Sequence, residues 1–151
     1  MYDSKIMFEL GYSFMNAGQV NFREDVFEER SKYQNIAGVV NLAFACELFL
    51  KCLLNAEGES FKRKHTLMEL WSKYMDSNTD DANMIKNSVM DHLVTDLSFD
   101  KLLQADSNVF INYRYFYEPE NLKEISNNPV RPQFLRVFCF MLCAYAKEKL
   151  V

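Results

Sequence analysis

An all-α fold, an up-and-down bundle of about five helices, is what this sequence predicts. Its 151 residues include only four glycines and three prolines, so few turns are available between regular elements. The strong helix formers Leu, Met, Ala, Glu and Lys are frequent, and apolar residues recur at helical spacing. No repeat and no low-complexity tract interrupts the chain. We therefore expect one domain over residues 1–151, long enough to bury a core.

The first helix is predicted at about residues 3–16, where the apolar side chains are spaced three or four apart. Gly18 is expected to loosen its end, since glycine is a poor helix former. Residues 19–30 mix apolar and charged side chains, and they either continue this helix or start another.

The longest helix is predicted at about residues 31–56, with Ser31 as its candidate N-cap and Gly58 just beyond its C-terminal end. Its second half is almost wholly apolar, but it contains Glu47 and Lys51. These two residues are four apart, so on a helix they lie on one face and can pair. Because their neighbours leave little room for solvent, each charge needs a partner.

Two shorter helices are expected next. One starts just before Thr66, which forms a capping-box pattern with Glu69, and it ends near Tyr74. The polar residues 76–81 predict a linker, and the following helix begins at about Asp80.

The last two helices are marked by their ends. A helix beginning at Ser98 or Asp100 is predicted to reach the aromatic cluster at residues 113–117, and Pro119 closes this segment. Pro132 fits the first turn of the final helix, because proline at that position loses no helical hydrogen bond.

The charge balance argues against general nucleic-acid binding. The formal net charge is −4 and the sequence pI is about 5.2, so any binding of RNA must be local. One dense basic cluster covers residues 62–64, and a solvated loop is its simplest explanation. A looser basic set consists of Arg114, Lys123, Arg131 and Arg136.

Several patterns predict a cytoplasmic protein without a metal or cofactor. The N-terminus lacks a signal-peptide pattern, and no apolar run reaches about 18 residues, so no membrane contact is expected. The four cysteines lie in apolar helical context, as reduced thiols of an intracellular protein do. Cys139 and Cys143 are four apart, which also fits a pair of zinc ligands. Buried thiols are the favoured interpretation, since short cysteine knuckles are absent.

Three motifs in a fixed order resemble the HEPN superfamily of small prokaryotic helical domains. They are Glu47-x-x-x-Lys51, then His65-x-Leu67-x-x-Leu70 after a short loop, then Arg114-Tyr115-Phe116-Tyr117-Glu118. The resemblance covers about residues 31–150. It implies a bundle of four to five helices, a homodimer, and a role in defence, toxin–antitoxin or stress systems that act on RNA or nucleotides.

One departure from this family bears on activity. Its catalytic members resemble metal-independent RNases in which His follows Arg after four to six residues. Neither Arg114 nor Arg131 is followed by a histidine at that distance, and His65 and His92 are the only histidines in the chain. We therefore expect a module that binds a partner protein or an RNA or nucleotide phosphate without catalysis. A divergent metal-independent RNase or toxin is the alternative.

The candidate site residues follow from the chemistry of phosphate binding and cleavage. His65 can serve as base or acid, Arg114 can clamp a phosphate, and Tyr115 can donate a proton or stack on a base. A structural network explains the same residues, with His65 capping a helix and bonding Glu47 and with Arg114 packing on aromatic rings. The predicted ligand-binding set is Glu47, Lys51, His65, Tyr113, Arg114, Tyr117 and Glu118.

Overall fold

The computed structural model describes residues 2–20, 28–62, 66–109, 118 and 132–150, with the backbone alone for residues 28–34. Within these ranges the chain forms helices and no strand, which confirms the all-α prediction. The helices are α1 (Ser4–Val20), α2 (Glu28–Ala56), α3 (Leu67–Ser77), α4 (Thr79–Asp91), α5 (Phe99–Asp106) and α8 (Pro132–Glu148).

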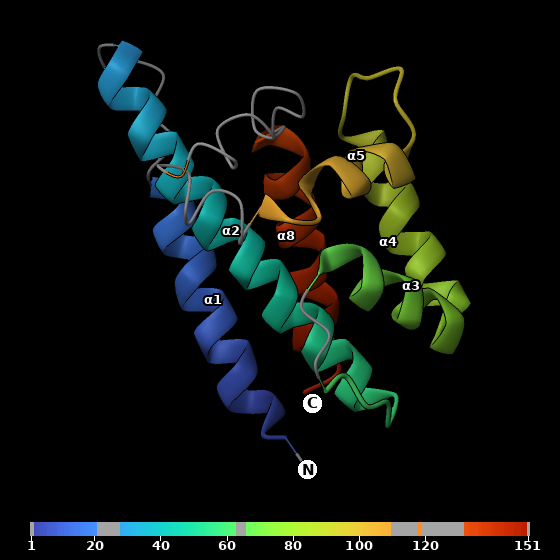
Figure 1. Ribbon diagram of the computed structural model, residues 1–151. Helices are drawn as coiled ribbons and strands as arrows, with labels where there is room; N and C mark the ends of the chain where they lie inside the picture. The colour runs from blue at the N-terminus through green and yellow to red at the C-terminus, as the bar shows by residue number, and fades with distance from the viewer. Residues whose placement is uncertain (1, 21–27, 63–65, 110–117, 119–131, 151) are drawn as a thin grey trace.

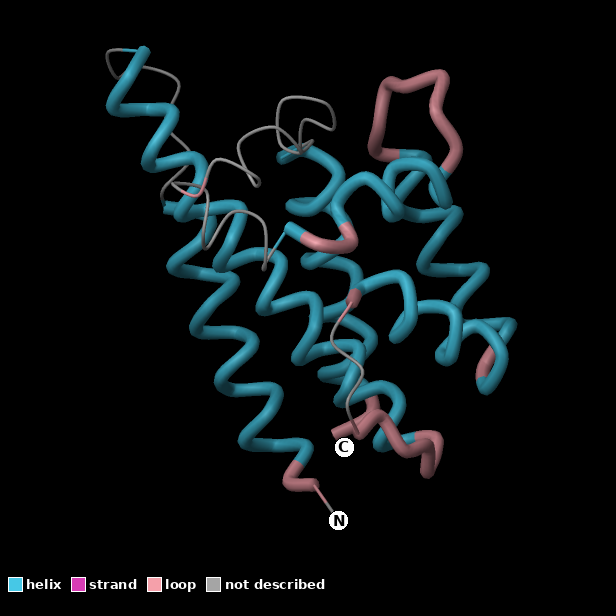
Figure 2. The backbone as a smooth tube through the Cα atoms, in the orientation of Figure 1, coloured by secondary structure: helices cyan, strands magenta, loops and turns pink. Residues whose placement is uncertain are grey.

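The central element of the bundle is α2, which has α1 on one side and α8 on the other (Figure 1). The chain ascends in α1, descends in α2, ascends again in α4 and descends in α8, and the shorter α3 and α5 join these runs (Figure 2). Two interactions fix the end where α2 and α8 finish. Asn55 donates a hydrogen bond to Ser4 Oγ at 2.6 Å, and the Lys149 ammonium lies 3.5 Å from Glu57 Oε1.

Two glycines bring α1 close to α2. A Cβ atom at Gly18 would lie 3.0 Å from the carbonyl oxygen of Gly38, and one at Gly11 would lie 2.9 Å from the ring of Phe49. The expectation that Gly18 loosens the first helix is wrong, because α1 continues to Val20. Tight packing against α2 compensates for the low helix propensity of glycine.

We expect Gly18→Val to lower the free energy of unfolding by about 1–3 kcal/mol, because the new side chain would overlap the α2 backbone. Chemical denaturation followed by circular dichroism measures this loss. Asn16→Val is the matched control, since Asn16 is exposed on the same helix. Equal losses in the two variants would contradict the close approach at Gly18.

An aromatic cluster joins α3, α5 and α8. The ring centroid of Trp71 lies 5.0 Å from that of Phe99 and 5.5 Å from that of Phe138. Phe134 and Phe138 stack at 5.4 Å, and Phe99 lies 5.5 Å from each of them. All four side chains are almost fully buried. Such offset and edge-on ring pairs add stability beyond their buried area.

The predicted ends of several helices are confirmed. Thr66 caps α3 by accepting from the Glu69 backbone N–H at 3.3 Å, and its hydroxyl lies 2.7 Å from the Glu69 carboxylate. Ser98 caps α5 in the same way, which places the start of that helix at Phe99. Gly58 follows α2 with a φ of 74°, in the left-handed region that glycine adopts without strain.

Two predicted boundaries are wrong. The long helix begins at Glu28, so Ser31 lies inside it and is no N-cap. The acidic residues before Ser31 are good helix formers, and they suit a helix N-terminus. The expected linker at 76–81 is almost wholly helical, since α3 and α4 are separated by Asn78 alone. Asn78 donates its backbone N–H to α3 and accepts from the Asp81 N–H at 3.1 Å, so one residue caps both helices.

The predicted continuation of the fifth helix to the aromatic cluster at 113–117 and Pro119 lies outside the described residues. Within them, α5 ends at Asp106.

The stretch Asn35–Ala56 of α2 is long and apolar enough to cross a membrane, by length and composition alone. The expectation that no apolar run reaches that length is wrong for this stretch. Although it contains two charged residues, its mean hydropathy is 1.8. Other parts of the protein bury 67% of the most apolar part of this stretch. Such burial is typical of the core helix of a soluble protein. The prediction of a core helix is confirmed, whereas a cytoplasmic location stays a prediction.

Candidate functional site

The predicted pair in α2 is formed. The Lys51 ammonium lies 2.6 Å from Glu47 Oε1, and their side chains are only 14% and 6% exposed. The ammonium also lies 5.9 Å from the centroid of the Phe61 ring. Neither residue lines the pocket of about 680 Å³ beside α8 or the smaller one of about 330 Å³ on α1. The geometry therefore supports a structural role for this pair more than a role in ligand binding.

The rest of the predicted site falls largely outside the described residues. This applies to His65, Tyr113, Arg114, Tyr115 and Tyr117. Glu118 is described and exposed. The convergence of Arg114 and His65 on one cleft, and the catalytic role of Tyr115, stay predictions.

The cysteines are buried free thiols, as the favoured interpretation expected. Burial raises the pKa of Cys52 to about 12 and that of Cys143 to about 11. Burial also raises the pKa of Cys139, whose thiol lies beside that of Cys46. Since the thiolate is the nucleophile, these buried thiols are poor candidates for nucleophilic catalysis. Within the described parts of the chain, no three metal-binding side chains come together.

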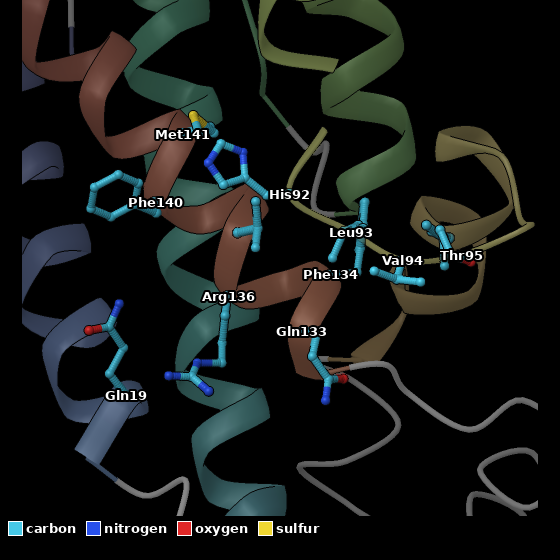
Figure 3. Close-up of a pocket in the computed structure, with 12 residues that line it drawn as sticks. Gln19, His92, Leu93, Val94, Thr95, Gln133, Phe134, Arg136, Phe140 and Met141 are labelled. Atoms are coloured by element: carbon cyan, nitrogen blue, oxygen red, sulfur yellow. The ribbon is translucent and has the colours of Figure 1, made fainter. Parts of the chain in front are cut away.

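A pocket of about 680 Å³ opens between the end of α1, the loop after α4, and α8 (Figure 3). This volume lies within the range of small-molecule sites, about 300–1,000 Å³. Its described polar lining residues are Gln19, His92, Thr95, Gln133 and Arg136. Its apolar lining residues are Leu93, Val94, Leu102, Phe134, Val137, Phe140 and Met141.

Five of the residues that line the pocket lie on one face of α8. Gln133, Arg136, Val137, Phe140 and Met141 follow the spacing i, i+3, i+4, i+7, i+8, so they share one face of the helix. The opposite face packs into the core. As Figure 3 shows, the guanidinium of Arg136 extends toward the side of Gln19, which comes from α1.

The other end of the pocket is formed by His92, the residue that ends α4. Its ring lies beside Met141, away from Arg136 (Figure 3). His92 Nδ1 is 2.7 Å from the Ser88 carbonyl oxygen. A carbonyl only accepts, so Nδ1 carries the hydrogen and donates. Nε2 is then left to accept from a ligand when the ring is neutral, or to donate to one when it is charged.

The electrostatics of the pocket differ from those of the chain. The chain has 21 acidic and 17 basic residues, yet the described lining includes Arg136 and His92 and no carboxylate. The amides of Gln19 and Gln133 add hydrogen-bond donors. Phe140 is 58% exposed and offers a flat apolar surface beside them. The arrangement suits a ligand that has one anionic and one flat apolar portion.

The sequence pattern alone does not predict this pocket. In the sequence, Arg136 belongs only to a loose basic set, and His92 is one of two histidines outside any Arg-to-His motif. The available signal was the helical spacing of Gln133, Arg136 and Phe140, which places two polar side chains and one aromatic ring on a single face. The contribution of His92 follows only from the way α4 packs against α8.

The comparisons with known proteins leave the family open. The sequence matches no protein-family model and no curated protein, and the fold matches no solved structure. The resemblance to the HEPN superfamily stays a prediction, whereas the structure shows an all-α helical bundle over the described residues.

Proposed function

We propose that this protein is a non-catalytic helical binding module that holds a nucleotide phosphate in the pocket between α1, α4 and α8. One observation carries the proposal: the described lining of the pocket is cationic and amide-rich in a chain with a net charge of −4. An anion bound at Arg136 gains charge-assisted hydrogen bonds, and no described carboxylate in the lining repels it.

The apolar wall supports a ligand that carries a base. Phe140 is more than half exposed, and Val94 is fully exposed. A nucleobase can stack on an exposed ring such as that of Phe140, which contributes about 1–3 kcal/mol per base in nucleic-acid complexes. Gln133 and Met141 are eight residues apart on α8, which corresponds to about 12 Å along the helix axis. An elongated ligand can therefore reach both Arg136 and the aromatic wall.

The titratable groups support binding without turnover. Cleavage of RNA without a metal needs one group to accept a proton and another to donate one. Among the described lining residues, His92 alone has a side chain of the kind that commonly transfers protons in catalysis, and a single group cannot fill both roles at once. The alternative function, a divergent RNase, depends on His65, Arg114 and Tyr115. A role in a defence, toxin–antitoxin or stress system depends on the family resemblance alone.

We expect AMP to bind the wild-type protein, and we expect Arg136→Ala to weaken this binding about tenfold to hundredfold, the value of a hydrogen bond to a charged group. Arg136→Lys should give an intermediate affinity, because lysine keeps the charge but loses the planar fork. Calorimetric titration measures these affinities. Adenosine serves as the ligand without phosphate, and it should bind more weakly than AMP.

Lys147→Ala is the matched control, since Lys147 is an exposed cation of α8 that does not line the pocket. It should leave the affinity for AMP unchanged. Because Arg136 also interacts within the protein, thermal melting must show that its variants stay folded. The proposal fails if AMP does not bind, or if Lys147→Ala weakens binding as much as Arg136→Ala. Cleavage of an RNA oligonucleotide by the wild type would contradict its non-catalytic part.

A further inference from the structure

The ring of His92 places a hydrogen-bond acceptor at one end of the pocket. This residue follows α4 and caps its C-terminal end. The backbone of Ser88, one turn earlier, holds the ring, because Nδ1 lies 2.7 Å from the Ser88 carbonyl oxygen. Since the carbonyl can only accept, Nδ1 keeps its hydrogen, and Nε2 of the neutral ring carries a lone pair. Unlike a hydroxyl, which can rotate to donate, this nitrogen only accepts while the ring is neutral.

Apolar side chains surround this acceptor. The ring of His92 lies beside Met141 (Figure 3), and Leu93 and Val94, the next two residues of the chain, also line the pocket. In the part of the chain that the structure describes, no protein group bonds Nε2. A ligand atom at this place must therefore donate a hydrogen bond, because two acceptors that meet lose their bonds to water and gain none.

The acceptor of His92 and the guanidinium of Arg136 lie at opposite ends of the pocket (Figure 3). Arg136 and Met141 are five residues apart on α8, which corresponds to about 7.5 Å along the helix axis. The side chain of Arg136 extends still further from His92, toward the side of Gln19. The exposed ring of Phe140, which directly precedes Met141, belongs to the His92 end. A ligand that reaches both ends therefore carries its anionic group well away from its donor.

We propose that His92 selects the base of the bound nucleotide and favours adenine through its amino group. This inference rests on the proposed function, in which Arg136 holds the phosphate and the base stacks on Phe140. The amino group of adenine lies on the ring distal to the sugar, and its N–H can donate to Nε2. The corresponding oxygen of guanine is an acceptor and would face the lone pair. The amino group of cytosine lies on a smaller base, which reaches less far from a phosphate held at Arg136.

Calorimetric titration with AMP and with purine riboside 5′-monophosphate tests this selection. The second ligand differs from AMP only in having hydrogen in place of the amino group. In a mildly alkaline buffer, which keeps an imidazole neutral, the wild type should bind AMP about fivefold to tenfold more tightly, as one hydrogen bond within reach of water contributes. His92→Ala should bind the two ligands equally. His92→Gln should restore part of the preference, because its amide oxygen also accepts.

Two further variants separate this inference from the proposed function. Asn87→Ala is the matched control, since Asn87 is an exposed residue of α4 that does not line the pocket, and it should keep the wild-type preference. Arg136→Ala should weaken both ligands equally and leave their ratio unchanged, because it acts on the phosphate. Equal binding of both ligands to the wild type, or a preference that survives in His92→Ala, would overturn the role of His92 and leave the phosphate site standing. If neither ligand binds, the proposed function and this inference are both wrong.

Discussion

Replacing Glu47 by leucine should lower the free energy of unfolding by about 3 kcal/mol, because it leaves the ammonium of Lys51 buried without its partner. The side chain of Lys51 is 14% exposed, so some water still reaches it. This places the expected loss at the lower end of the range for broken buried pairs. Glu47 also has a further interaction in the protein, which the substitution removes as well.

The double variant Glu47→Leu with Lys51→Met should recover most of that loss. An apolar pair of similar volume removes both charges together, and such replacements are often neutral. Urea denaturation of the wild type, the single variant and the double variant measures the difference. If both variants lose the same small amount, the pair contributes no more than a surface ion pair, and the interpretation of that face of α2 is wrong.

Phe138→Ala should lower the free energy of unfolding by about 3–5 kcal/mol, because it opens a cavity at the centre of the aromatic cluster. Phe138 contacts Trp71, Phe99 and Phe134, so three helices lose packing at once. The single tryptophan of the chain lies in this cluster, so its fluorescence follows the unfolding directly.

The matched control for this variant is Phe140→Ala. Phe140 is two residues further along α8 and is 58% exposed, so its removal should change stability by no more than about 0.5 kcal/mol. It should instead weaken AMP binding, since the proposed nucleotide stacks on this ring. A large loss of stability in Phe140→Ala, or a small one in Phe138→Ala, would contradict the described packing of α8.

The sequence predicted the helices well where local physics decides them. Periodicity placed α2 and α8, and the hydroxyls of Thr66 and Ser98 marked where α3 and α5 begin. It failed at Gly18, where tertiary packing outweighs propensity. It also failed at Asn78, because a short polar run is typical of a linker as well as of two helices that share one cap.

The candidate site was harder to predict than the fold. The Glu47–Lys51 pair was foreseen, because both residues lie on one helix at fixed spacing. The pocket combines Gln19, His92 and Arg136 from three separate parts of the chain. No spacing along the sequence links such residues, and only the packing of α1 and α4 against α8 brings them together.

The buried thiols of α2 and α8 can report when these two helices separate, without any added label. Cys46 and Cys139 lie side by side where these helices meet, so a water-soluble thiol reagent can reach them only while the helices are apart. The rate at which such a reagent modifies the folded protein would therefore measure how the bundle opens. Its dependence on reagent concentration would separate how often α2 and α8 part from how long they stay open.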